Sequence, residues 1–369
     1  MSLDTFCRGQ LKMLSEHYEV VAVSSPDPEL KTVAEREGVR TIAVPMARHI
    51  SLVSDVKALF KMISVFRREK PDIVHSITPK AGLVSMLAGW ICRVPVRMHT
   101  YTGLVFPTET GMKQKILIWM DRLLCACATY INPEGQGVAN DLKRFGITRK
   151  PLHIIGNGNV RGINADFWKA DEEAVAEVRE QLHINPEKDY VFIFVGRLVR
   201  DKGINELVSA FHRLSEERQN VKLVLVGRSE EQLDPLKPET LKEIKSNANI
   251  LAAGRQSDVR PFYAMADAFA FPSYREGFPN TVLEAGAMGL PSIVTDINGA
   301  NEIIIPQQNG IIVPSRNADA FYEAMKWFME HPKEVKTMAS NARRMIVDRY
   351  EQHYLWGELL KVYKELGNQ

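Results

Sequence analysis

The feature that most constrains this chain is an alternation of short apolar runs with amphipathic helical segments along its whole length. The runs lie at 20–23, 41–44, 72–76, 96–100, 128–131 and 152–155, and again at 190–195, 221–226, 249–254, 268–273, 291–296 and 310–314. Strands that alternate with helices in this way are typical of parallel sheets covered by helices on both faces. We therefore predict an α/β protein in which each half forms one doubly wound, Rossmann-like sheet.

The length of the chain suits two domains. At 369 residues it is long for a single hydrophobic core, and the Gly- and Asn-rich stretch at 156–168 is typical of a linker. We predict an N-terminal Rossmann-like domain at 1–158, a C-terminal one at 159–345 and a final helical segment at 346–369.

The first residues lack the strand with which a doubly wound domain normally begins, because MSLDTFCRGQLKML reads directly as a helix. We expect the first strand of domain 1–158 to be missing, either because the start codon is placed late or because the first strand and loop were lost, with MSL as a vector remnant. The alternative is a domain that begins at a helix.

Composition disfavours several classes of function. The formal charge of +2 is too small to favour nucleic acid as the main partner. The cysteines Cys7, Cys92, Cys125 and Cys127 form no C-x-x-C motif, which favours a reducing cytoplasm. The sequence has no apolar window long enough to cross a bilayer, so any membrane contact would be peripheral.

The stretch SYREGFPNTVLEAGAMGLP, residues 273–291, predicts a helix whose first position is Pro279. Glu276 then lies in the loop before this helix and Glu284 lies inside it. The first turn offers backbone donors suited to phosphate oxygens, near Asn280, Thr281 and Val282. This pattern fits a ligand with a central phosphate and hydroxyl-bearing groups on both sides, such as a sugar nucleotide.

A second motif, FVGRLVRDKG at 194–203, places Arg197 just after a predicted strand and Lys202 before the next helix. Two fixed cations at such a turn can bind a diphosphate, whereas the alternative is two solvated surface cations. The strand before Glu276 belongs to the same predicted sheet, and ligands of these sheets bind at the carboxyl ends of the strands. This common position favours the diphosphate interpretation.

In the first half, His99 ends the run at 96–100. A lone histidine is more often structural than catalytic, and His75 holds the same position in its own strand. Lys80, Thr102 and Gly103 are further candidates for the cleft.

Several catalytic motifs are missing from the sequence. It contains no G-x-x-x-x-G-K-[ST], no H-E-x-x-H, no G-x-S-x-G and no Asp-x-Asp pair. Without Asp-x-Asp, the usual carboxylate anchor for a metal that carries a sugar diphosphate is missing. We therefore expect protein cations and helix N–H groups to neutralise the phosphates, and we expect no metal.

Together, GRLVRDKG, SYREGFPNTVLEAGAMGLP and NGIIVP resemble the donor domain of the retaining glycosyltransferases of family 4. The resemblance extends over nearly all of the chain, and SLDTFCRGQLKML and TPKAGL resemble bacterial members that assemble surface polysaccharide or glycan on a polyprenyl diphosphate. It implies the GT-B fold, in which two Rossmann-like domains face a central cleft and the last helix crosses back to the first domain. We accordingly predict that the tail aromatics pack on the first domain, namely Tyr350, Tyr354, Trp356 and Tyr363.

The resemblance also implies roles for individual residues. Arg197 and Lys202 would hold the donor diphosphate, Glu284 the ribose hydroxyls and Glu276 the transferred sugar. The N–H groups near Asn280, Thr281 and Val282 would face the distal phosphate. Arg255 matches a loop that contacts the base, His99 a position near the reacting carbon, and Gly9 a loop that faces the diphosphate.

The implied activity is that of a metal-independent, retaining hexosyltransferase without a cofactor. It would move a sugar from a nucleotide-sugar donor, UDP-linked, to a glycan or polyprenyl-diphosphate-linked acceptor. Two alternatives stay open: a sugar-nucleotide 2-epimerase of the same layout, and a non-catalytic nucleotide-sugar-binding protein.

A polyprenyl-linked acceptor would bring the protein to the inner face of the membrane, and the segment at 110–130 carries a matching pattern. It combines cations with apolar residues, namely Lys113, Lys115 and Arg122 with Ile116, Ile118, Trp119 and Leu123. A second helix adds Lys57, Lys61, Arg67 and Arg68. Such a stripe suits an anionic membrane surface, whereas the alternative is that its apolar residues face the domain core.

Overall fold

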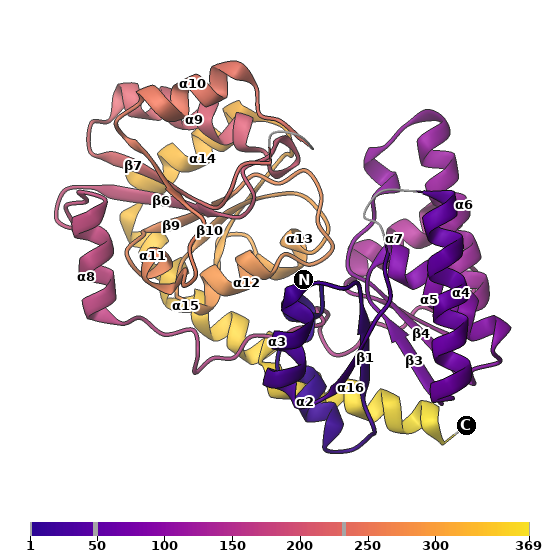
Figure 1. Ribbon diagram of the computed structural model, residues 1–369. Coiled ribbons are helices and arrows are strands. Elements are labelled where there is room, and N and C mark those ends of the chain that lie inside the picture. The colour runs from indigo at the N-terminus through magenta and orange to yellow at the C-terminus, as the bar shows by residue number, and fades with distance from the viewer. Residues whose placement is uncertain (1, 47–50, 231–233, 369) are drawn as a thin grey trace. The chain divides into compact units, whose positions relative to one another are not determined.

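The computed structural model describes residues 2–46, 51–230 and 234–368, which form two compact units (Figure 1). Unit 1 comprises residues 1–162 and 352–369, and unit 2 comprises residues 163–351. Both units are α/β with parallel strands, as predicted. The observed boundaries fall a few residues beyond those expected at 158/159 and 345/346.

The described residues of unit 1 contain five strands. Its elements are α1 (Ser2–Phe6), α2 (Gln10–Ser15), β1 (Val21–Ser24), α3 (Pro28–Glu37), β2 (Arg40–Ala43), α4 (Leu52–Glu69), β3 (Ile73–Ser76), α5 (Pro79–Ile91), β4 (Val96–Tyr101), the 3-10 helix η1 (Phe106–Thr108), α6 (Gly111–Cys127), β5 (Tyr130–Pro133), α7 (Gln136–Arg144) and α16 (Gln352–Gly367).

The strands of unit 1 form two separate parallel sheets, β1–β2 and β3–β4–β5. No strand among the described residues joins these two sheets, so unit 1 has a divided sheet where one continuous doubly wound sheet was predicted.

One predicted strand is wrong. The run at 152–155 is irregular in the structure, although His153 N–H donates to the Ile131 carbonyl of β5 at 3.0 Å. The chain then enters a turn in which both Gly156 and Gly158 have positive φ, of 56° and 89°. One backbone hydrogen bond to β5 beside such a turn does not form the repeated hydrogen-bond pattern of a paired strand.

Unit 2 contains six strands within 163–230 and 234–351, the part of it that the structure describes. Its elements are α8 (Glu172–Gln181), β6 (Tyr190–Val195), the 3-10 helix η2 (Arg200–Lys202), α9 (Ile204–Glu217), β7 (Val221–Val226), α10 (Pro238–Ser246), β8 (Ile250–Gly254), α11 (Arg260–Ala264), β9 (Ala268–Phe271), α12 (Asn280–Ala287), β10 (Ser292–Thr295), α13 (Ala300–Ile303), β11 (Gly310–Val313), α14 (Ala318–Glu330) and α15 (Pro332–Tyr350).

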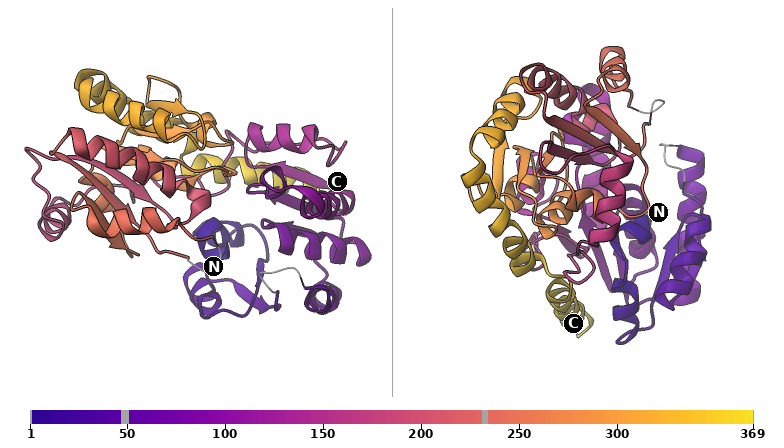
Figure 2. Two further views of the ribbon diagram at one scale, coloured as in Figure 1. Left: turned by 90° about the horizontal axis from the view of Figure 1, so that it is seen from above. Right: turned by 90° about the vertical axis from the view of Figure 1, so that its left-hand side faces the viewer.

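These strands form one parallel sheet in the order β11-β10-β9-β6-β7-β8. Helices lie on both sides of it, as two further views show (Figure 2). The central strands are apolar along their whole length because both of their faces are buried; Phe192, Phe194 and Phe269 are 0% exposed. The order reverses between β6 and β9, and a doubly wound sheet binds its ligands at the carboxyl ends of the strands at this point.

The tail divides at Glu351, where α15 ends and α16 begins. The prediction that its aromatics pack on the first domain is confirmed for α16, because Trp356 packs on Gly9 and the Tyr363 hydroxyl lies 2.6 Å from His75 Nδ1. It is wrong for Tyr350, which is buried in unit 2 with its ring centroid 5.4 Å from that of Phe278. Tyr354 is 44% exposed.

Candidate active site

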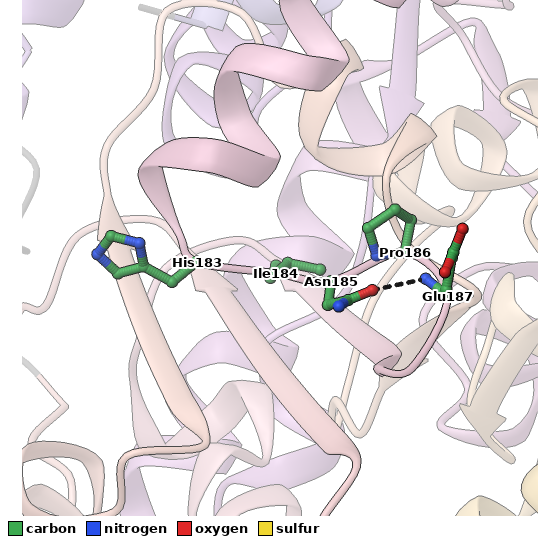
Figure 3. Close-up of a pocket in the computed structure, with 5 residues that line it drawn as sticks. All are labelled: His183, Ile184, Asn185, Pro186 and Glu187. Carbon is green, nitrogen blue, oxygen red and sulfur yellow. Dashed lines mark hydrogen bonds between the residues drawn. The ribbon is translucent and has the colours of Figure 1, made fainter.

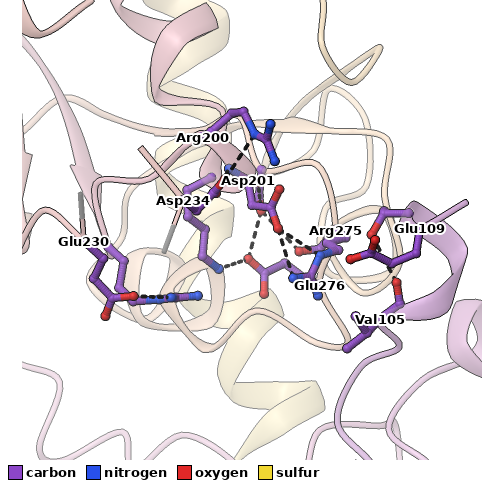
Figure 4. Close-up of polar contacts among 12 residues, drawn as sticks. Val105, Glu109, Arg200, Asp201, Glu230, Asp234, Arg275 and Glu276 are labelled. Atoms are coloured by element: carbon purple, nitrogen blue, oxygen red, sulfur yellow. Dashed lines mark hydrogen bonds and ion pairs between the residues drawn. The ribbon is translucent and has the colours of Figure 1, made fainter. Parts of the chain in front are cut away.

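In unit 2, the loops that follow β6 and β9 meet at the point where the strand order reverses. The first loop carries Lys202 and the second carries Glu276, and these two side chains form an ion pair. Ser273 Oγ donates to Glu276 Oε1 at 3.0 Å. Figure 4 shows Glu276 beside Asp201 and Arg275, which form a second ion pair between the same loops at 3.0 Å. The side chains of Lys202 and Glu276 are 20% and 18% exposed, so solvent and ligands can reach both groups.

Gly203 explains why the two loops approach so closely. Its φ is 70°, and a Cβ at this position would overlap the carbonyl oxygen of Pro272, directly after β9. Only glycine combines this conformation with this contact at low cost. The close approach places Lys202 against the loop that carries Glu276.

The second acidic residue, Glu284, lies inside α12 and is 8% exposed. Tyr263 Oη donates to Glu284 Oε2 at 3.5 Å. The helix begins at Asn280, so Pro279 is the residue that caps it and not its first position as predicted. The Val282 N–H donates to the Pro279 carbonyl at 3.1 Å, so this amide is already used within the turn.

Arg197 follows β6 and has a partner in this structure. Its Nη1 lies 2.7 Å from Glu230 Oε2, and the same carboxylate also pairs with Arg228 at 3.2 Å. Hydrogen bonding from Arg197 holds the pKa of Glu230 below its usual value. Because the Arg197 side chain is 49% exposed, this pair is easily exchanged for another anion.

In unit 1, the structure buries His99 completely. Its Nδ1 lies 2.8 Å from Ser76 Oγ, while its Nε2 has no hydrogen-bond partner among the described residues. Burial, and secondarily the neighbouring His75, lowers the pKa of His99 to about 3. The imidazole is therefore uncharged at neutral pH and can take part in hydrogen bonds, but it cannot serve as a cation.

Two other candidates have clear local environments. The Gly9 N–H donates to Glu37 Oε1 at 3.0 Å, and the Lys12 N–H donates to the second oxygen at 3.2 Å. The Gly9 amide is thus occupied by an internal carboxylate, and its positive φ of 77° and its contact with Trp356 explain the glycine. Arg255 follows β8 and is exposed.

Sequence reasoning missed Ser273, Tyr263 and Glu230. Ser273 follows the apolar run of β9 directly, which is the signal that could have identified it. The other two come from segments far from the motifs in sequence, and only the sheet order brings them to Glu284 and Arg197.

A surface hollow elsewhere in unit 2 has a structural explanation. It lies at the turn between α8 and β6 and is lined by His183, Ile184, Asn185, Pro186 and Glu187 (Figure 3). The Asn185 side chain accepts the Glu187 N–H at 3.0 Å and so stabilises the turn itself. We assign no ligand to this hollow.

Comparison with known proteins identifies the family of the chain. The glycosyl transferase 4-like domain matches residues 4–158 and the glycosyl transferases group 1 domain matches residues 176–345. The chain is 31% identical to the capsular polysaccharide biosynthesis glycosyltransferase CapM of Staphylococcus aureus, over 96% of this chain and 92% of the relative. It is 27% identical to the UDP-Gal:alpha-D-GlcNAc-diphosphoundecaprenol alpha-1,3-galactosyltransferase of Escherichia coli, over 85% and 81%.

Among solved structures, Anabaena HepE in complex with UDP and glucose superposes with a TM-score of 0.81 at 18% identity, over 99% of this chain and 96% of that one. This likeness shows the fold. The relationship to CapM, together with the two matched domains, shows the family. The chain therefore belongs to the family 4 glycosyltransferases, which join a glycosyl transferase 4-like domain to a group 1 domain in the GT-B fold.

Proposed function

We propose that this glycosyltransferase transfers a sugar from a UDP-sugar to a polyprenyl-diphosphate-linked glycan, with retention of anomeric configuration and without a metal ion. The observation that carries the proposal is the cluster of Lys202, Glu276 and Ser273 at the point in unit 2 where the strand order reverses. The Escherichia coli relative, whose name states a UDP-Gal donor and a diphosphoundecaprenol acceptor, supports the choice of substrates.

In this proposal Lys202 and Arg197 bind the diphosphate. Both cations are paired with carboxylates, and a diphosphate would take over part of that role. Glu276 would then accept hydroxyls of the sugar, and the buried Glu284 would accept those of the ribose. As the bond to the sugar breaks, negative charge develops on the leaving phosphate, and fixed cations stabilise it.

The same arrangement accounts for retention. In this proposal no carboxylate attacks the reacting carbon of the sugar as a covalent nucleophile. Glu276 instead binds sugar hydroxyls, and it is paired with Lys202. The acceptor hydroxyl would attack from the side of the leaving group, and the leaving phosphate would accept its proton. His99 is uncharged and completely buried, so in this scheme it does not transfer a proton.

A panel of UDP- and GDP-sugars tests the proposal. We expect slow hydrolysis of one UDP-sugar without acceptor, faster turnover with a polyprenyl-diphosphate-linked sugar, and unchanged rates in EDTA. Loss of turnover in EDTA that magnesium or manganese restores would contradict metal independence. Release of an epimerised nucleotide sugar would identify a 2-epimerase, and donor binding without turnover a non-catalytic protein.

Unit 1 carries an exposed surface suited to a membrane. On α6, Met112, Ile116 and Trp119 are 70%, 46% and 63% exposed, whereas Ile118 and Leu123 pack against the core. On α4, Val53, Val56 and Phe60 are 69%, 50% and 67% exposed, on the face that also exposes Lys57 and Lys61. Both helices pack against α5. The six exposed apolar residues and the two lysines together form what we call the α4–α6 surface. We propose that this surface contacts an anionic membrane, where the acceptor lies.

Peripheral contact is the mode to test, since none of the helices among the described residues is long and apolar enough to span a bilayer. We expect the protein to cosediment with vesicles of phosphatidylglycerol and phosphatidylcholine at low salt. The change Lys57→Gln with Lys61→Gln should weaken partitioning by about 30-fold, because each cation contributes about 1 kcal/mol near an anionic surface.

The matched control is Lys333→Gln with Lys336→Gln, which removes two exposed lysines from α15 in unit 2. This variant should partition like the wild type. Equal losses in the two double variants would mean that net charge alone drives binding, and wild-type protein that stays in the supernatant would refute membrane contact.

A further inference from the structure

Unit 1 contains a second cavity with its own polar groups, of about 110 Å³. It is enclosed by the start of α5, the loop after β4 and the middle of α6, and its lining is Pro79, Lys80, Leu83, Gly103, Leu104, Val105, Leu117, Met120, Asp121 and Leu124. This volume is well above the space that one water molecule needs. The start of α5 follows β3, so the cavity lies at the carboxyl ends of the two strands β3 and β4, where parallel sheets bind ligands.

The lining is apolar except for two oppositely charged side chains, Lys80 and Asp121. Lys80 Nζ lies 2.7 Å from Asp55 Oδ1 of α4, which holds the ammonium group at the cavity. The hydroxyl of Tyr101, a side chain that is 1% exposed, lies 3.1 Å from Cys125 Sγ and lowers the pKa of the Asp121 carboxyl. The ammonium group of Lys80 is thus positioned by Asp55, and the carboxyl of Asp121 has a buried hydroxyl group as a neighbour.

Asp121 retains capacity to accept further hydrogen bonds. A carboxylate offers about four acceptor sites, and the single hydroxyl of Tyr101 can fill no more than one of them. Burial raises the pKa of Asp121 to about 7, although the Tyr101 hydrogen bond opposes this rise. Polar groups in apolar surroundings normally have partners, so a ligand that donates a hydrogen bond here would stabilise the carboxylate.

The chemistry of the cavity selects among small groups. A hydroxyl could bond to Asp121, but it would leave the apolar walls formed by Leu83, Leu117 and Leu124 without a partner. A carboxylate would be attracted by Lys80 and repelled by Asp121. An acetamido group fits all three features, since it has an N–H donor, a carbonyl acceptor and a methyl group.

We propose that this cavity binds the acetamido group of the acceptor's terminal sugar: Asp121 accepts its N–H, Lys80 donates to its carbonyl, and the leucines surround its methyl. The inference rests on the proposed transfer to a glycan acceptor and specifies that acceptor as an N-acetylated sugar. The name of the Escherichia coli relative, with GlcNAc as its acceptor sugar, is consistent with this choice.

Two acceptors that differ at a single position test the inference. Both are polyprenyl-diphosphate-linked monosaccharides, so that the linked sugar is also the terminal one; the first carries a 2-acetamido group and the second a 2-hydroxyl. The wild type should favour the acetamido acceptor by at least about 10-fold in kcat/KM, because a site built for hydrogen bonds rejects an analogue that lacks them. Asp121→Leu should bring this ratio close to one. The control Asp141→Asn, a carboxylate-to-amide change on α7 outside the cavity, should keep the wild-type ratio.

A binding measurement separates failure of the cavity from failure of the transferase. In saturation-transfer NMR, N-acetylglucosamine 1-phosphate should receive its strongest signal at the acetamido methyl, and Leu117→Phe, which fills the cavity, should reduce that signal. This result without turnover of any UDP-sugar would refute the proposed transfer and keep the cavity assignment. The assignment would be overturned if the wild-type protein had equal kcat/KM for the two acceptors, or if folded wild-type protein gave no signal at the acetamido methyl. Both measurements use the wild-type protein, so neither depends on whether Asp121→Leu folds.

Discussion

Lys202→Ala is expected to weaken binding of the UDP-sugar by about 5- to 150-fold, measured by calorimetry with UDP or with the donor selected from the panel. The change removes a cation at the carboxyl end of β6, and a hydrogen bond to a charged group contributes about 1–3 kcal/mol. It also leaves the Glu276 carboxylate without its ion-pair partner, so that negative charge remains where a phosphate would bind. Glu284→Ala should weaken donor binding by a similar factor.

The control for Lys202 is Lys169→Ala. Lys169 is also paired with a carboxylate, Asp166, at 2.7 Å in unit 2, but it belongs to an exposed turn away from the strand ends. This control should leave donor affinity unchanged. If Lys202→Ala bound UDP as tightly as the control, the assignment of the diphosphate site would be wrong.

Gly203→Ala is expected to lower the free energy of unfolding by about 2–5 kcal/mol. The left-handed conformation costs a residue with a side chain about 1–2 kcal/mol, and the overlap with the Pro272 carbonyl adds the cost of overpacking, about 1–3 kcal/mol. The strain acts on the contact that holds the Lys202 loop against the Glu276 loop, so donor affinity should fall as well. Urea unfolding followed by circular dichroism measures the first effect.

Gly289→Ala separates the cost of the left-handed conformation from the cost of the overlap with Pro272. Gly289 has a φ of 84° in the same unit, and a Cβ there would meet nothing within 4 Å. This variant should therefore lose only the cost of the left-handed conformation and should keep its donor affinity. Equal destabilisation of the two variants would show that the contact with Pro272 does not constrain the loops.

The strands of unit 2 and the position of its site could be predicted from the sequence because their determinants are local. Runs such as YVFIFV at 190–195 are apolar throughout, since a central parallel strand is buried on both faces. Polar residues in the loops that follow two such runs lie at the same edge of a parallel sheet. Lys202 and Glu276 were expected there, and the structure brings them into contact.

Local pattern fails where a partner lies far away in the chain. The run at 152–155 resembles a strand in composition but makes too few backbone hydrogen bonds to be one. Tyr350 and Tyr363 belong to the same aromatic tail, yet the break at Glu351 assigns them to different units. Glu37 occupies the Gly9 amide across a separation of 28 residues, which spacing within either motif does not reveal.

The sequence by itself determined the α/β class, the strands of unit 2 and the loops that carry its charged residues, because apolar periodicity and turn residues act over short distances. Only the tertiary structure decided which face of α6 is exposed, since Ile116 and Ile118 are equally apolar and differ only in what packs against them. It alone placed Lys80 and Asp121 at one cavity, although they are 41 residues apart in the sequence. Burial and pairing depend on the packing of distant segments, and a pattern of residue types carries little information about that packing.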